Sequence, residues 1–231
     1  MAKKNKVVLM GFVNEIINQD PMLFTIKIRK NPRRFVYPIV ELGEGAKDLK
    51  NNIKSGALVI VEGRITTEQR EEKYDCPNPS CHEKIIDRYI STKVTAESIK
   101  FVKEIEKNSD VFLNQVILLG VVCREKDFRY IEGTKSPLGN TKYQIAVNRR
   151  EPNATDYPWV ASFARQAEED ARRLQVGSQV LVDGILNTRK NDKECTCTLC
   201  NSKIEVCEHL TEVVTNSVEY LNNCIFDEKQ K

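Results

Sequence analysis

Apolar and polar residues alternate along several stretches of the chain, and this period of two is typical of half-buried β-strands. The stretches include SGALVIVEGRI at 55–65 and TKVTAESIKFV at 92–102, and the continuous apolar run of NKVVLMGFV at 5–13 also predicts a strand. A longer period appears in ASFARQAEEDARRL at 161–174, where apolar residues recur every three or four positions. That spacing predicts a helix, so the chain is expected to consist mainly of strands with few helices.

The same order of elements occurs twice, with the second copy 109 to 121 positions after the first. The matched segments are 5–13 with 114–122 (NQVILLGVV), 36–40 (VYPIV) with 156–160 (DYPWV), 55–65 with 176–186 (VGSQVLVDGIL), and 92–102 with 211–221 (TEVVTNSVEYL). Four matches in one order indicate a tandem duplication. We predict a first domain at 1–106, a second at 107–225 and a short tail at 226–231.

Each half contains three predicted strands, a helix and two further strands in about 110 residues. The helix is 161–174 in the second half and GAKDLKNNIK, 45–54, in the first, where Ser55 and Gly56 end it. This is the layout of the OB fold, a five-stranded Greek-key barrel. The predicted fold is therefore all-β dominated, with two tandem OB-fold domains that each carry one helix between strands 3 and 4.

Composition places the chain among intracellular globular proteins. Of its 231 residues, 40% are hydrophobic and 30% are charged. The longest apolar runs, such as QVILLGVVC at 115–123, are too short to cross a bilayer. The basic N-terminus is not followed by a long apolar segment and a cleavage site, so we expect a cytoplasmic protein without a membrane partner.

Positive charge is concentrated near the N-terminus. The net charge is +3, yet residues 1–40 hold eight Lys or Arg against Glu15 and Asp20. A basic excess of this kind suits a polyanionic partner, although a solvated basic face is an equally simple interpretation.

The second half resembles bacterial single-stranded DNA-binding proteins (SSB) over nearly its whole length. The segments that carry the resemblance are NQVILLG, FRYIEG, YQIAVNRRE, FARQAEEDARRL, GSQVLVDGILNTRK and TEVVTNSVEYL. The first half resembles this family only through its similarity to the second. Family members with two OB folds in one chain dimerise, so the resemblance implies a homodimer with four barrels.

A protein that binds a single strand needs flat rings for the bases and cations for the phosphates, and the resemblance together with the residue types indicates candidates for both; Trp159 is one of them, although the family often has a basic residue at its position. Tyr157 stands where the family usually has a stacking tryptophan, Phe163 matches a family phenylalanine, and Trp159 shares a strand face with Tyr157. Around the second barrel the candidates also include Phe128, Arg129, Tyr130, Arg149, Arg150, Arg189 and Lys190; around the first they are Arg29, Lys30, Arg33, Arg34, Phe35, Tyr37 and Arg64. Aromatic strand residues are also common in cores, which is the alternative for each ring.

Two departures from the family pattern limit what can be carried over. Glu151 follows AVNRR where the family usually has an aromatic residue, which predicts weaker stacking there. The chain ends in NNCIFDEKQK without the acidic, phenylalanine-terminated tip that recruits replication enzymes. We therefore expect no recruitment of partners by that route.

The eight cysteines favour metal binding over disulfides in an intracellular protein. Cys123 and Cys224 have apolar neighbours and are expected to be buried thiols. In KECTCTLCNSKIEVCEH, 193–209, a structural Zn²⁺ is expected on Cys197, Cys200, Cys207 and His209, with Cys195 spare or in place of Cys197. A regulatory disulfide and free thiols are the alternatives.

Cys76 and Cys81 of the first half align with Cys195 and Cys200 at an offset of 119. With only the adjacent His82 in addition, they are too few for a closed zinc site. We favour a decayed half-site or partial occupancy. Completion of a four-cysteine site with Cys195 and Cys200, or with a second subunit, is the alternative.

The predicted function is sequence-independent binding of single-stranded DNA in replication, recombination or transfer, without enzymatic activity. A closed zinc site has no open position for water, and no nucleophile–base set stands near it. The alternatives are an RNA-binding OB protein, and a replisome or primosome scaffold that binds proteins through its barrels and zinc hairpins. In a third version only the second barrel binds DNA while the first dimerises.

Overall fold

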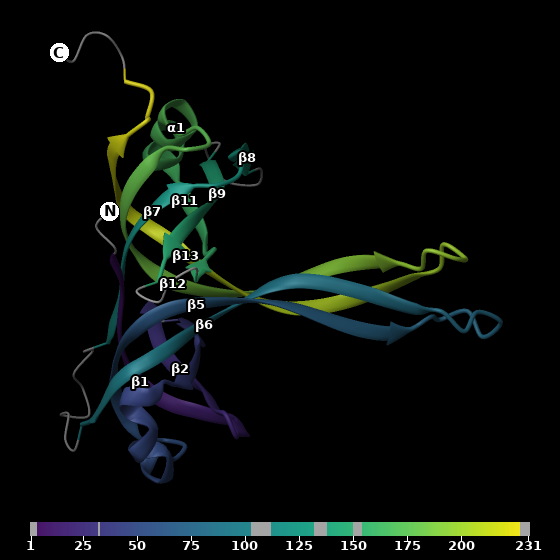
Figure 1. The fold of residues 1–231 in the computed structure, drawn as a ribbon, viewed down its shortest axis with the longest axis horizontal. Coiled ribbons are helices and arrows are strands. Elements are labelled where there is room, and N and C mark those ends of the chain that lie inside the picture. The colour runs from purple at the N-terminus through teal and green to yellow at the C-terminus, as the bar shows by residue number, and fades with distance from the viewer. Residues whose placement is uncertain (1–3, 32, 103–111, 132–137, 150–153, 227–231) are drawn as a thin grey trace.

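Two barrels and two long hairpins make up the protein (Figure 1). The computed structural model describes residues 4–31, 33–102, 112–131, 138–149 and 154–226. In Figure 1 the barrels lie one above the other, and both hairpins extend from the same side of the pair. The described residues contain no helix with the length and apolarity that a bilayer crossing needs.

The first barrel is a closed ring of strands. Its elements are β1 (Lys4–Gln19), β2 (Met22–Asn31), β3 (Arg34–Val36), β4 (Ile39–Leu42), the 3₁₀ helix η1 (Glu44–Asn52), β5 (Leu58–Asp75) and β6 (Lys84–Phe101). Antiparallel pairing joins β2 to β1 and β4, and β5 to β1 and β6. The parallel pair β4–β6 closes the ring, while β3 pairs with the outer end of β2.

The second barrel repeats this ring. Its elements are β7 (Leu113–Val122), β8 (Asp127–Ile131), β9 (Leu138–Asn148), β10 (Thr155–Asp156), β11 (Trp159–Phe163), α1 (Ala164–Arg173), β12 (Gln179–Thr196) and β13 (Lys203–Asn222). The ring runs β7–β9–β11–β13–β12 and returns to β7, with β11–β13 as the parallel pair. Two five-stranded rings of this kind confirm the predicted all-β, OB-type fold.

The helices differ from the prediction in type and extent. The first-half segment forms a 3₁₀ helix. In the second half the helix begins at Ala164, because Val160 and Ala161 extend the sheet by pairing with β13. Ala167 and Leu174 are fully buried, as expected for the apolar face of that helix.

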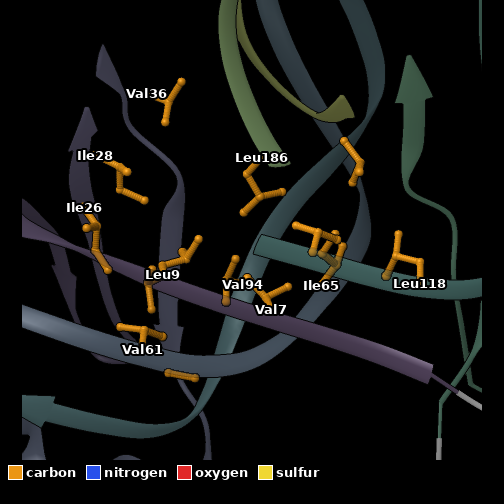
Figure 2. Packing of buried hydrophobic residues seen from close by; sticks show 14 of the residues in the cluster. Val7, Leu9, Ile26, Ile28, Val36, Val61, Ile65, Val94, Leu118 and Leu186 are labelled. Atoms are coloured by element: carbon orange, nitrogen blue, oxygen red, sulfur yellow. The ribbon is translucent and has the colours of Figure 1, made fainter. Parts of the chain in front are cut away.

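The barrels share one sheet through their first strands. β1 pairs antiparallel with β7, and the register places Val7 opposite Val116. These two valines are equivalent positions of the repeat, so an approximate two-fold axis passes between them. Figure 2 shows buried side chains of both halves around this junction, including Leu9, Leu118 and Leu186. The two halves therefore fold around a common apolar cluster.

The glycines that recur seven positions apart have two different structural roles. Gly56 and Gly177 have φ of +83° and +93°, a region that glycine adopts without a steric penalty. Gly63 and Gly184 lie at irregularities in the β5–β6 and β12–β13 pairings. A Cβ on Gly63 would lie 2.2 Å from the Thr95 carbonyl oxygen, which explains why no side chain is present there.

The outer parts of the two hairpins form the first arm (residues 67–92) and the second arm (residues 188–211). Each arm contacts the opposite barrel at an equivalent position. Thr188 Oγ1 accepts a hydrogen bond of 2.9 Å from the Tyr37 backbone N–H, and Thr67 Oγ1 accepts one of 2.8 Å from Tyr157. The arms also meet each other, through an ion pair of 2.8 Å between Lys193 and Asp87.

Candidate nucleic-acid interface

A groove of about 950 Å³, which we name the arm groove, lies between the arms and the second barrel. The first arm contributes Arg88 and Tyr89, and the second contributes Arg189 and Lys193. Tyr157 and Trp159 form part of the opposite wall. Three structural units thus enclose one basic, aromatic surface.

A second groove of about 930 Å³, the barrel groove, lies between the two barrels. The β2–β3 hairpin of the first barrel supplies Lys30, Arg33, Arg34, Phe35 and Tyr37. Tyr130 and Phe163 line it from the second barrel.

The two grooves share Arg129, Lys142, Arg189 and Glu212 and form one continuous surface. Together their walls contain nine Lys or Arg against three Glu. This excess of positive charge attracts a polyanion and would be partly neutralised by its phosphates.

Glu212 is the charged centre of this surface. Its side chain is 7% exposed and lies 3.7 Å from Lys142 Nζ and 3.4 Å from Arg189 Nε. Asn187 donates a hydrogen bond to Glu212 and accepts one from Lys30 of the first barrel. Burial lowers the pKa of Lys142, and the charge of Glu212 opposes that shift. Cations of both barrels are therefore held around one buried carboxylate.

Partly exposed rings stand beside these cations. Phe35, Tyr37 and Tyr157 are 38%, 39% and 42% exposed, and Trp159 is half-buried. Lys142 Nζ lies 5.0 Å from the centre of the Trp159 ring, and Lys27 Nζ lies 4.4 Å from that of Phe35. Flat rings next to cations provide both contacts that a single nucleic-acid strand requires.

Four cysteines meet where the arm tips approach each other. Cys76 and Cys81 come from the turn of the first arm, and Cys197 and Cys200 come from that of the second. Their sulfur atoms all lie within 4.8 Å of one another, with 3.4 Å between Cys76 and Cys200 and 3.8 Å between Cys81 and Cys197. The Ser202 hydroxyl lowers the pKa of Cys200 to about 6, which favours its thiolate. The cluster has the donor set of a soft divalent metal site.

Residues 113–219 match the model of the single-strand binding protein family. Single-stranded DNA-binding protein 1 of Staphylococcus aureus is 31% identical over 124 residues, which cover 52% of this chain and 72% of that protein. The chain belongs to the single-strand binding protein family.

A family relative from Oceanobacillus iheyensis, also described as a single-stranded DNA-binding protein, is 32% identical over 114 residues. The match covers 47% of this chain and 63% of that relative, so the chain spans less than two thirds of its length. A crystal structure of a deletion mutant of the Thermus aquaticus single-stranded DNA binding protein is similar over 100% of both chains. Its TM-score is 0.65 and its sequence identity 22%, a similarity of fold. The family resemblance identified from the sequence is thereby confirmed.

Most of the family-derived candidates lie in the two grooves. Those that line them are Tyr157, Trp159, Phe163, Arg129, Tyr130, Arg189, Lys30, Arg33, Arg34, Phe35 and Tyr37. The structure does not bring Phe128, Lys190, Arg29 and Arg64 into either groove, and Arg150 lies outside the described residues. Tyr157 and Trp159 both line the arm groove, but Tyr157 lies between β10 and β11 and not on a strand with Trp159.

Arg149 has a different environment from the one expected of a single-strand-binding residue. Its guanidinium binds both carboxylate oxygens of Asp156, at 3.0 and 2.8 Å, and Asp156 is fully buried. Asp156 also accepts a hydrogen bond from the backbone N–H of Thr67 in the first arm. Arg149 therefore helps to hold the arm on the second barrel.

Several groove residues were missed by the family-based reasoning: Lys142, Arg124, Arg88, Tyr89 and Lys193. Arg88, Tyr89 and Lys193 lie on the arms, between the matched segments that the sequence identified as strands. The β-branched and aromatic residues of IDRYIS were the available signal, because they favour a strand that continues β6 into the first arm. Lys142 immediately precedes the family segment YQIAVNRRE, and no sequence pattern indicated that it lines a groove.

The predicted zinc ligands are corrected in two respects. Cys207 and His209 do not join the cluster, because β13 already includes them and its register places them opposite Asp192 and Lys190, away from the turn. Cys195 packs near the cluster without belonging to it. Cys76 and Cys81 are no decayed half-site, since they supply half of the cluster.

The two isolated thiols are less buried than expected. Cys123 and Cys224 are both half-buried, and Cys123 lines the arm groove.

Proposed function

We propose that this chain binds single-stranded DNA along the joined arm and barrel grooves, largely independently of sequence, in replication, recombination or transfer. The continuous surface of nine cations and partly exposed rings carries this proposal. Relatives that are 31% and 32% identical over the second half are described as single-stranded DNA-binding proteins. A strand in these grooves would contact both barrels and both arms.

The assembly around this function is also proposed. The barrels would correspond to domains 1–106 and 107–225, and a homodimer would present four of them. We place the protein in the cytoplasm, in line with its cysteine-rich sequence. Zn²⁺ is the structural cofactor that the four-thiol cluster suits best, because tetrahedral sulfur sites favour it.

The direct test is a titration with short oligo-dT at several salt concentrations. Binding is followed by the anisotropy of a labelled strand and by the fluorescence of Trp159, the single tryptophan. We expect quenching of Trp159, and an affinity that falls with salt with a logarithmic slope of about −0.7 per phosphate contacted. Equal-length duplex DNA and oligo-rU serve as competitors. Absence of binding at low salt, or stronger competition by oligo-rU, would contradict the proposal.

Replacement Glu212→Gln is expected to strengthen single-stranded DNA binding about three- to ten-fold. The carboxylate competes with phosphates for Lys142 and Arg189, so its neutral amide leaves both cations available to the strand. The measurement is the dissociation constant with labelled oligo-dT at fixed salt. Glu205→Gln, an exposed residue of the same hairpin that lines neither groove, is the control. Weaker binding by Glu212→Gln would show instead that the carboxylate is needed to position the cations.

A further inference from the structure

We propose that Cys76, Cys81, Cys197 and Cys200 bind one zinc ion and thereby clasp the tips of the two arms together. The site would join the two repeats of one chain, with two thiolates from each. Its role as a clasp of the DNA groove rests on the proposed function, whereas the metal site itself does not.

The distances between the sulfur atoms fit a metal better than disulfides. Four thiolates about 2.3 Å from a central zinc form a tetrahedron with edges of about 3.8 Å. The Cys81–Cys197 and Cys76–Cys200 separations are 3.8 and 3.4 Å, and every pair lies within 4.8 Å. Sulfur atoms in a disulfide are about 2.05 Å apart.

Both turns hold their thiols in place by backbone hydrogen bonds. In the first turn, Asn78 accepts bonds from the backbone N–H groups of Cys81 and Ser80. In the second, Cys197 donates to the Ser202 carbonyl and accepts from Asn201, whose φ of +58° turns the chain back. The second turn has the Cys-x₂-Cys spacing of zinc knuckles, and the first offers Cys-x₄-Cys.

Among the described residues, the apolar contact between the tips is small. The buried apolar cluster between them consists of Cys81, Ile85 and Cys197, with partly buried neighbours. A pair of two-stranded hairpins with so small a core is marginally stable in water. Metal binding supplies the missing stabilisation in small domains of this kind.

The clasp would set the width of the arm groove. The first arm contributes Arg88 and Tyr89 to that groove, and the second contributes Arg189 and Lys193. Lys193 of this groove also connects the two arms through its ion pair with Asp87. A metal at the arm tips would fix the distance between the two arms. It would thereby also fix the distance between the groove residues that the arms carry.

The test is metal analysis and Co²⁺ substitution of the reduced full-length chain. We expect one zinc per chain, and after exchange the intense visible bands of tetrahedral cobalt thiolate. Single variants C76S, C81S, C197S and C200S should each lose the tetrahedral spectrum. C207S and H209A, which alter two predicted ligands of the second hairpin that lie outside the cluster, should keep it. Circular dichroism establishes which variants are folded.

Single-stranded DNA binding is then compared for zinc-loaded protein, chelator-treated protein and C197S. Without metal the two arm tips are no longer held together, so we expect single-stranded DNA to bind about ten-fold more weakly. C207S should bind single-stranded DNA as the unchanged protein does. If the protein binds zinc but not DNA, the zinc site is supported and only the proposed function is overturned. Iron in place of zinc, cross-arm disulfides that form although the protein is prepared with a reductant, or a retained cobalt spectrum in folded C76S/C81S would overturn the zinc site. Unchanged DNA binding after complete metal removal would overturn its role as a clasp.

Discussion

Replacement of Trp159 by alanine is expected to weaken binding of single-stranded DNA by 1–3 kcal/mol, or about 5- to 150-fold. The indole is half-buried in the wall of the arm groove and lies 5.0 Å below Lys142 Nζ. A base stacked on this ring would replace water on its open face, while the ammonium group would remain beside the phosphate backbone. The dissociation constant with labelled oligo-dT measures the effect.

Two further variants make this result specific. Phe128→Ala removes an aromatic side chain that is 37% exposed and lines neither groove, so it should leave the affinity within about two-fold. Trp159→Phe keeps a ring and should restore part of the loss. An equal loss in Phe128→Ala and Trp159→Ala would show that the strand follows another path over the second barrel.

Replacement Arg149→Met is expected to lower the free energy of unfolding by about 3–5 kcal/mol. It leaves the fully buried Asp156 carboxylate without its cation, and among the described contacts the Thr67 N–H remains as its hydrogen-bond donor. An unpaired charge in that position is costly because no solvent replaces the guanidinium. Urea unfolding of the purified chain measures the change.

The matched control is Arg129→Met, which removes a cation from both grooves. The Arg129 side chain is 64% exposed and lies 3.8 Å from Asp127, so its loss should change stability by less than about 1 kcal/mol. The same variant should weaken DNA binding and flatten its salt dependence. The interpretation of Arg149 fails if its replacement reduces DNA affinity and leaves the unfolding free energy as it was.

Much of the fold follows from local patterns. Alternation marks the strands, and the return of each landmark marks the repeat; the structure has equivalent strands at those places, such as β1 and β7. The predicted start of the helix, residue 161, lies three residues before the observed start at Ala164, because the first residues of the predicted helix belong to strand β11. Local periodicity does not reveal that Val160 and Ala161 pair in parallel with β13, because that strand is more than fifty residues away in the sequence.

The candidate site was predicted less completely, for a related reason. The sequence indicated Tyr157, Trp159 and Arg189, which lie in or beside strand segments that can be recognised from the repeat. It could not indicate Arg88 or Lys193, because their role depends on two arms crossing the same barrel. Arg149 looks like a groove cation in sequence, and only its bidentate pair with a buried carboxylate reveals a structural role.

The sequence by itself determined the strands, the duplication, the family and a cysteine-rich region suited to metal, since each depends on residues close together or on matched segments. Tertiary structure decided which cysteines meet and where the grooves lie. Within one hairpin, Cys207 and His209 have suitable spacing for a zinc site; across two hairpins, Cys76 and Cys81 are the thiols that reach Cys197 and Cys200. The physical reason is that alternation fixes which way a side chain points from its own strand, whereas its partner depends on how separate strands pack together.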